Sequence, residues 1–194
     1  MAASRDAPAL GAESICVFPV TQPRATQSVR CVGCGALVPD ITGPTHEYME
    51  SSPGCWLAYG DVLGREYIDP AFGAMLRLTA DTYAVQHPGR PSSRNAIQSV
   101  CAHLLSLCLI IDKGTSFTVG ERGIGWVIER KSRFTWLTPP SSLGEITVVD
   151  IAGWESAAEH GKQVRAWAEG AWSAWAPHHD TVREWASSML SERE

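Results

Sequence analysis

The sequence lacks an excess of positive charge. Its 16 lysine and arginine residues are outnumbered by 21 aspartate and glutamate residues, which gives a formal net charge of −5. A protein that binds nucleic acid neutralises phosphates with a basic surface, so this balance argues against nucleic acid as a partner. Hydrophobic residues make up 44% of the chain and charged residues 19%, a composition that excludes a wholly disordered protein.

Long hydrophobic runs are also missing. The longest, residues 104–111, is interrupted by Ser106 and ends at Asp112, well short of the roughly 20 apolar residues that a membrane helix needs. Residues 1–30 contain no apolar run of the length a signal peptide requires. We therefore expect a cytoplasmic protein with no membrane partner. Its six cysteines are then expected to be metal ligands, thiols or core residues rather than disulfides.

The length of 194 residues suits one domain. The periodicity predicts a mainly α fold with a small β portion (α+β), in which a single helical domain carries an N-terminal CxxC zinc-stapled loop. We expect a tail or strap over 1–30 with a candidate strand at 15–20. The rest is predicted as one domain, 31–194: a metal-binding loop at 31–55, a three-helix core at 53–111, short strands at 115–151 and C-terminal helices at 155–190.

The strongest chemical signal is the pair Cys31 and Cys34 in a CxxC arrangement with flanking glycines. Two thiolates at this spacing can chelate one tetrahedral ion, because the intervening turn points backbone N–H groups at the sulfurs. A closed site needs two more ligands, and the nearest candidates are His46 and Cys55. We predict a zinc ion held by these four residues, with a structural role favoured and a catalytic role left open.

Cys55 also fits a second role. Ser52 and Pro53 predict a helix start, which places Cys55 in the first helical turn, where free N–H groups and the helix dipole favour a thiolate. It could therefore be a metal ligand or a nucleophile. Two alternatives remain for the cysteines as a group: ordinary buried core residues, or a redox CxxC. The redox motif prefers a helix immediately after it, and the segment that ends at Pro39 offers no long one.

A second cluster of polar residues is predicted in the helices. Asp81 lies on an otherwise apolar line of the helix at 71–86, so its buried carboxylate needs a partner. Candidates are spread over this helix, the next helix and the start of the last one, and such a set could hold a water-activating metal or act as a His–Asp general base. The candidate catalytic residues are Asp81, Tyr83, His87, His103 and His179.

Each of these residues also has an ordinary interpretation as a satisfied core or surface side chain. We interpret His160 as a solvent-facing residue of its helix. The C-terminal tryptophans, which recur at helical spacing, are interpreted as core rather than as a stacking platform.

Three segments resemble a known family. They are Cys31-Val-Gly-Cys34-Gly-Ala, Ser52-Pro-Gly-Cys55-Trp and Asp81-Thr-Tyr83-Ala-Val-Gln86-His87-Pro88-Gly89. Over about residues 31–185 the chain is similar to an uncharacterised bacterial family, mainly actinobacterial, that is known only as a domain of unknown function. The resemblance implies no activity, but it singles out the same cysteines and the same Asp81, His87 and His103.

Taken together, these patterns favour a zinc-binding cytoplasmic protein with a polar His/Asp cavity, an enzyme that acts on a small molecule, in bacterial specialised metabolism. The alternative is a non-catalytic, zinc-stabilised adaptor or regulatory module, and a third possibility is a CxxC thiol redox protein. Convergence of Asp81, His87, His103 or His179 in one solvent-connected pocket would favour an enzyme or binding protein. Separate, fully satisfied side chains would favour the adaptor. The sequence gives no indication of oligomeric state.

Overall fold

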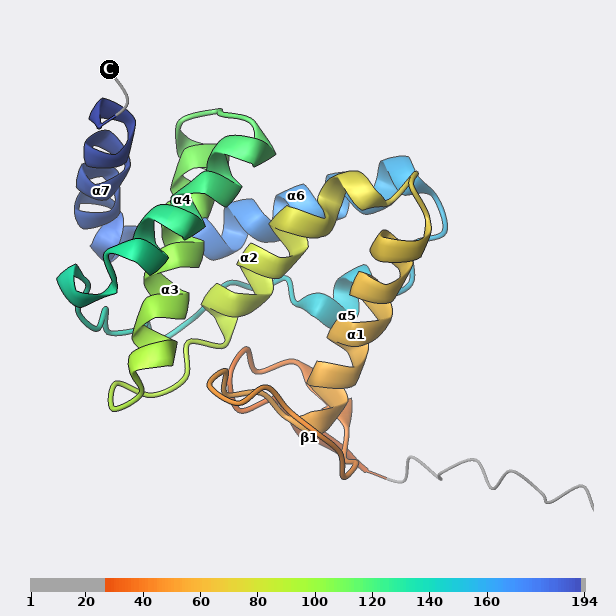
Figure 1. The fold of residues 1–194 in the computed structure, drawn as a ribbon. Coiled ribbons are helices and arrows are strands. Elements are labelled where there is room, and N and C mark those ends of the chain that lie inside the picture. Colours follow the sequence, from red (N-terminus) through yellow and green to blue (C-terminus); the bar gives the residue numbers. More distant parts are fainter. Residues whose placement is uncertain (1–26, 193–194) are drawn as a thin grey trace, which may run out of the picture.

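Helices provide most of the architecture in the computed structural model, which describes residues 27–192 (Figure 1). The expected tail or strap at 1–30 and its candidate strand at 15–20 lie almost wholly outside these residues. The prediction of a mainly α fold with a small β portion is confirmed. The elements are β1 (Ser28–Arg30), β2 (Leu37–Pro39), α1 (Pro53–Ile68), α2 (Leu76–Gln86), α3 (Arg94–Leu107), α4 (Phe117–Glu129), α5 (Val148–Ile151), α6 (Ala157–Ala174) and α7 (His179–Ser191).

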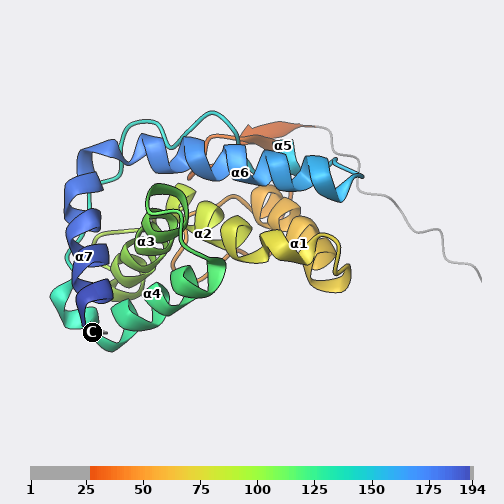
Figure 2. The same ribbon diagram turned by 90° about the horizontal axis from the view of Figure 1, so that it is seen from above.

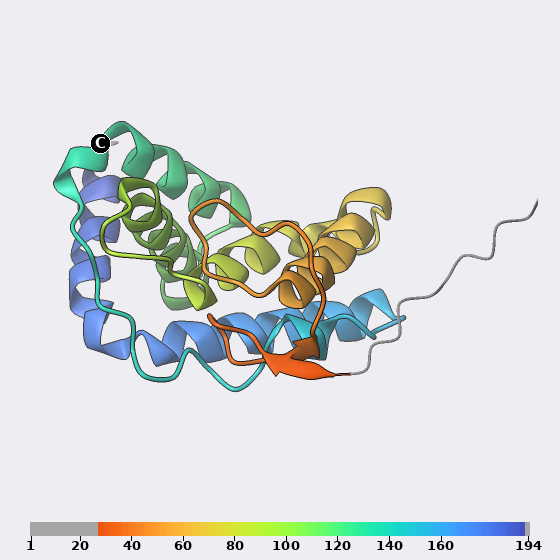
Figure 3. The same ribbon diagram turned by 90° about the horizontal axis from the view of Figure 1, so that it is seen from below.

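The two short strands frame the CxxC segment. β1 and β2 pair antiparallel, with Val29 opposite Val38, and the chain between them turns through Cys31 and Cys34. Cys31, Ala36 and Val38 are buried, so this hairpin is anchored to the core by three small apolar side chains. The loop 40–52 then curves past the end of α2 before α1 begins (Figure 3). The strands therefore hold the two cysteines close to the ends of two helices.

The start of α1 follows the predicted signal. Ser52 has an extended backbone at the N-cap, and Pro53 occupies the first helical position, where its missing N–H is not needed. Cys55 consequently lies in the first turn of α1 and is fully buried. The start of α1 lies beneath the β1–β2 turn, and this packing brings Sγ of Cys55 to 3.8 Å from Sγ of Cys34.

The core is built around α2 and α3. Residues 78–88 are all buried except Ala80, as expected for a central helix. α2 packs against α3 and α6, and α3 against α4 and α7; Figure 2 shows α6 lying along this layer with α7 turned across its end. The side chain of Gln86 receives an indole N–H from Trp167 at 2.9 Å. Trp167 and Trp175 are fully buried, which confirms the interpretation of these tryptophans as core.

The prediction of short strands over 115–151 is wrong for the described structure. Residues 117–129 form α4, residues 148–151 form α5, and the only strands among the described residues are β1 and β2. In the sequence alone, the glycines that separate these short segments favour turns. In the structure Gly120 and Gly123 face α3 and its extension, and a Cβ at Gly120 would lie 2.6 Å from Ile110. They permit close helix packing instead.

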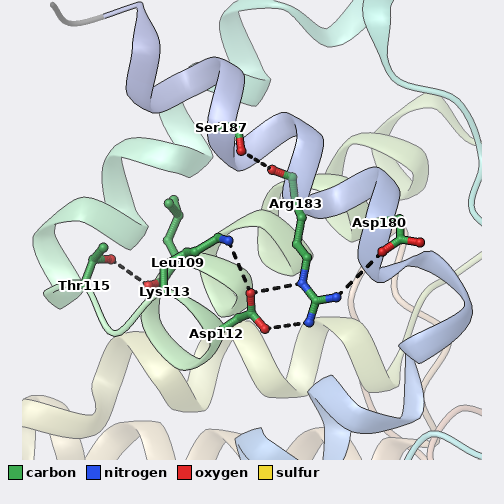
Figure 4. A network of polar contacts seen from close by, with 7 residues as sticks. All are labelled: Leu109, Asp112, Lys113, Thr115, Asp180, Arg183 and Ser187. Carbon is green, nitrogen blue, oxygen red and sulfur yellow. Dashed lines mark hydrogen bonds and ion pairs between the residues drawn. The ribbon is translucent and has the colours of Figure 1, made fainter.

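One helical stretch, Arg94–Asp112, is long and apolar enough to span a membrane by length and composition alone, but most of it is buried inside the fold. It comprises α3 and a short π-helical turn, η2 (Cys108–Asp112). The end of this stretch is tied to α7 by the carboxylate of Asp112, which receives two hydrogen bonds from Arg183 at 2.7 and 3.1 Å (Figure 4). The stretch therefore serves as a core helix.

Candidate metal centre

Four potential ligands from three separate segments meet beneath the β1–β2 turn. Cys31 and Cys34 come from that turn, Cys55 from the first turn of α1, and His87 from the residue that caps the end of α2. Their ligand atoms all lie within 4.8 Å of one another. Cys31, Cys55 and His87 are buried, and Cys34 is half-buried. The cluster can therefore hold a metal ion.

The interatomic distances match a tetrahedral site. The Sγ atoms of Cys34 and Cys55 are 3.8 Å apart, and Nε2 of His87 lies 3.5 Å from the Sγ atoms of both Cys31 and Cys55. Around a tetrahedral zinc ion, with Zn–S bonds of about 2.3 Å and a Zn–N bond of about 2.05 Å, two sulfurs are about 3.8 Å apart and a sulfur is about 3.55 Å from the nitrogen. Three of the six separations among the ligand atoms thus match a tetrahedral site, and all six lie within 4.8 Å.

The turn that carries Cys31 and Cys34 depends on two glycines. Gly35 adopts a φ of +76°, which favours glycine. Gly33 lies so close to the chain that an added Cβ would collide with the carbonyl of Glu50 and the ring of His87. A backbone donor reaches the turn from the start of α1, since the N–H of Ser52, the N-cap residue, donates to Sγ of Cys31 at 3.4 Å.

His87 is oriented by the helix to which it belongs. Its Nδ1 donates a hydrogen bond of 2.7 Å to the carbonyl of Tyr83, one helical turn earlier. Nδ1 keeps its proton in this bond, so Nε2 is the ring nitrogen that can bind a metal ion, with the cation replacing any proton on it. The ring of Tyr83 stacks on the imidazole with centroids 3.9 Å apart, and its hydroxyl donates to Sγ of Cys55 at 3.7 Å. Tyr83 therefore supports two of the four ligands.

The electrostatics of the cluster favour a cation. Hydrogen bonds with Cys34 and Cys55 hold the pKa of Cys31 far below its ordinary value. Burial alone would lower the pKa of His87, but hydrogen bonds to Cys31 and Cys34 outweigh burial and raise that pKa to about 9. The cluster therefore combines a thiol that ionises readily, Cys31, with surroundings that stabilise positive charge at His87. A divalent ion bound here would suit both conditions.

His46, the predicted fourth ligand, does not belong to this cluster. Its Nδ1 accepts a weak hydrogen bond from the N–H of Tyr48, and its ring packs edge-on against Tyr48 and Trp56. Sequence spacing favoured the nearest histidine, whereas the fold carries His87 back to the cysteines through the whole length of α2. The buried thiols Cys101 and Cys108 also lie outside the cluster, and burial raises their pKa values to about 12 and about 11.

The five candidate catalytic residues do not converge. Tyr83 and His87 belong to the metal centre, whereas Asp81, fully buried, pairs with Nδ1 of His103 at 2.7 Å and with Arg77 at 2.8 Å. Ser106 adds a third contact by donating to the same carboxylate at 2.5 Å. His179 lies elsewhere: it stacks on Trp172 and its Nε2 donates to the carbonyl of that residue at 2.9 Å.

Sequence reasoning missed a further buried pair. His160, which was interpreted as solvent-facing, is only 1% exposed, and its Nε2 lies 2.7 Å from Oε1 of Glu66. The hydroxyl of Thr79 donates to the same oxygen at 2.6 Å. A signal was available, because His160 precedes Val164 by four residues and Trp167 by seven and so lies on the apolar stripe of α6.

Comparison with known proteins gives one result. A family model described as a family of unknown function (DUF5946) matches residues 29–176. The chain belongs to this family. No curated protein and no solved structure matches it. The part that matches DUF5946 contains the four ligands of the metal centre as well as Asp81 and His103, and it ends before α7.

Proposed function

We propose that this protein binds one zinc ion in the Cys₃His centre and that the ion is structural. Three thiolates and one imidazole form a soft tetrahedral donor set, which suits zinc and disfavours magnesium or calcium. The proposal includes a reducing compartment such as the cytoplasm, because the thiolates must stay unoxidised to bind the ion.

One observation supports the structural role: four protein ligand atoms lie within 4.8 Å of one another, enough to supply all four positions of a tetrahedral site. Catalytic zinc sites typically have three protein ligands and keep the fourth position for water or substrate. Here Cys31, Cys34, Cys55 and His87 fill all four positions, and three of these side chains are buried. When bound, the ion supplies cross-linking rather than Lewis-acid chemistry.

The ion would stabilise the loop 40–52, which has no regular secondary structure of its own. The two ends of this loop lead to Cys34 and Cys55. A single ion bound at both ends, and also to the end of α2, converts this loop into part of the core. We therefore favour the non-catalytic, zinc-stabilised adaptor or regulatory module over the enzyme. The separation of the metal centre, the Asp81–His103 pair and His179 supports this choice.

The decisive experiment compares two histidines. We expect purified protein to contain one zinc per chain by mass spectrometry. His87→Ala should lose the zinc and His46→Ala should keep it. Cobalt substitution gives a second readout, because a tetrahedral Cys₃His site produces strong visible absorption that a three-ligand site alters. A second comparison uses two cysteines. Cys34→Ala removes a ligand, and Cys101→Ala, which removes a buried cysteine outside the centre, is its matched control.

Two results would overturn the proposal. One is zinc-free protein with a reversible disulfide between Cys31 and Cys34, which the redox alternative requires. The other is zinc that persists in His87→Ala at full occupancy with an unchanged cobalt spectrum. Removal of zinc by a chelator should also lower the midpoint of thermal unfolding, and an unchanged midpoint would contradict the structural role.

A further inference from the structure

We propose that a second site, a pocket of about 340 Å³ beside His103, binds a small neutral molecule that combines an apolar ring or chain with a hydroxyl or amide donor. The pocket lies between α3, α4 and the loop that carries Tyr48. Its size falls at the lower end of the range of roughly 300–1,000 Å³ that is typical of small-molecule sites. This inference goes beyond the proposed role of the metal centre and does not depend on it.

His103 presents an acceptor to this pocket. Its Nδ1 lies 2.7 Å from Oδ1 of Asp81, and because a carboxylate can only accept, Nδ1 carries the proton. The other ring nitrogen, Nε2, has no protein partner among residues 27–192, and the side chain is 17% exposed and lines the pocket. In the neutral ring, Nε2 is therefore an acceptor available to a ligand.

Asp81 acts as a positioning residue. Arg77 from the preceding turn of α2 and Ser106 from α3 hold the same carboxylate at 2.8 and 2.5 Å. Three partners on a fully buried group leave it one orientation, so the imidazole of His103 is fixed before any ligand arrives. A ligand that binds Nε2 does not have to restrict the ring further.

Neighbouring polar groups in the pocket have unused hydrogen-bonding capacity. Ser99 lies one helical turn before His103 on α3, and its hydroxyl is buried without a partner in the described structure. Buried polar atoms are normally satisfied, and an unsatisfied one needs an explanation. The side chains of Asn95 and Gln98 also line the pocket and make no hydrogen bond within the part of the chain that is described. A bound molecule would satisfy these groups together.

The composition of the lining limits the chemistry of the ligand. Ala102, Ile124 and Ile128 provide an apolar wall, and no aspartate, glutamate, lysine or arginine lines the pocket. A charged ligand would lose hydration without gaining a counter-ion, which is costly. A neutral molecule with an apolar part against Ile124 and a donor toward Nε2 of His103 matches both the apolar wall and the acceptor of the pocket.

Phenol and anisole form the sharpest pair of probes, because they share the ring and differ in the donor. We expect phenol, titrated into ¹⁵N-labelled protein as purified, to shift the NMR signals of Ser99 and His103, including Nε2. Anisole should bind about tenfold more weakly, the upper range for the loss of one hydrogen bond. Equal binding of the two probes, or phenol shifts confined to other surfaces, would overturn the proposal.

Variants separate recognition from folding. His103→Ala should abolish the preference for phenol, while His178→Ala, a histidine outside the pocket, should not change it. Ile124→Trp fills the pocket without touching the Asp81 contacts and should abolish binding of both probes even if His103→Ala fails to fold. Phenol binding that survives Ile124→Trp would contradict the site.

The role of Asp81 has its own readout. Asp81→Asn offers an amide donor to Nδ1 and so shifts the ring proton to Nε2, which then donates. We expect the preference to shift from phenol toward anisole, a change that a merely structural role would not produce. An unchanged ratio of the two affinities in a folded Asp81→Asn protein would show that Asp81 does not position His103.

Discussion

The carbonyl of Tyr83 accepts a hydrogen bond of 2.7 Å from Nδ1 of His87. The same tyrosine reaches a second ligand through its hydroxyl, which donates to Sγ of Cys55 at 3.7 Å. One residue thus fixes the tautomer of the imidazole and reduces the negative charge on a sulfur. Outer contacts of this kind tune a metal centre without touching the ion.

Loss of the Tyr83 hydroxyl should weaken zinc binding while leaving the fold intact. We expect Tyr83→Phe to lower the zinc affinity by about tenfold, since the loss of such a contact typically costs 10–100-fold. Competition with a zinc-binding dye measures the change. Tyr59→Phe is the matched control, because Tyr59 stacks on Tyr83 with centroids 3.8 Å apart but makes no hydrogen bond to the centre. Equal affinities in the two variants would contradict the assigned contact.

Gly33 should tolerate no side chain. A Cβ there would collide with the backbone of Glu50 and the ring of His87, so Gly33→Ala should displace a ligand and release zinc. Gly60→Ala provides the opposite case within α1. Gly60 is exposed with open space around it, and the substitution should raise the free energy of unfolding by about 0.5–1 kcal/mol. Zinc content and chemical unfolding of both variants test the pair; full zinc occupancy in Gly33→Ala would refute the packing argument.

The buried carboxyl of Glu66 should make stability fall as pH rises. Burial raises its pKa above the ordinary value of about 4.3. The favourable contribution is therefore complete below that ordinary value and is lost as pH rises through the folded-state pKa. Glu66→Gln keeps the acceptor for Thr79 and His160 but cannot ionise. We expect it to gain stability relative to the natural protein as pH increases above about 4.3.

Urea unfolding of Glu66→Gln and of the natural protein at several pH values measures the difference between their free energies of unfolding. The pH dependence of the metal centre is common to both proteins and cancels in this difference. Glu169→Gln is the control for the loss of one carboxylate at an exposed position of α6. A flat difference for Glu66→Gln would show that the carboxyl is not destabilised by burial.

The link between Asp112 and Arg183 predicts the reverse dependence. Hydrogen bonds from Arg183 are the main cause of the lowered pKa of Asp112. The stabilisation is present above the ordinary pKa of about 3.9 and is lost as pH falls through the folded-state value. NMR titration of the Asp112 carboxyl should show its pKa rising toward the ordinary value in Arg183→Gln. Lys113→Gln should shift it less, since Lys113 is 3.7 Å away. Equal shifts in both variants would contradict the dominant role of Arg183.

Sequence patterns over a few neighbouring residues correctly predicted the features that depend only on those residues. The CxxC spacing identified Cys31 and Cys34, and the Ser52-Pro53 signal placed Cys55 at a helix start. The fourth ligand could not be found in this way, because His87 reaches the cysteines only after α2 has packed against the rest of the fold. Spacing offered His46 as a ligand because it lies near the cysteines in the chain, and the same criterion could not detect His87, which is distant from them in sequence.

The strand prediction over 115–151 is wrong because glycine has two roles: it favours turns, and it allows helices to pack closely. In a local pattern, Gly120 and Gly123 indicate turns, but in the fold they allow α4 to approach α3 and its extension closely. Which use applies depends on a partner helix that the local sequence does not reveal. His160 differs from these cases, since its position on the apolar stripe of α6 was visible in the sequence.

The order of the ligands along the chain has a consequence for biosynthesis. Cys31, Cys34 and Cys55 all precede His87, and α2 must be complete before His87, which caps its end, can turn toward the sulfurs. On a translating ribosome, three soft donors therefore emerge while the fourth is still inside the exit tunnel. A nascent chain can capture an ion early but can close the tetrahedron only when the second long helix has been released.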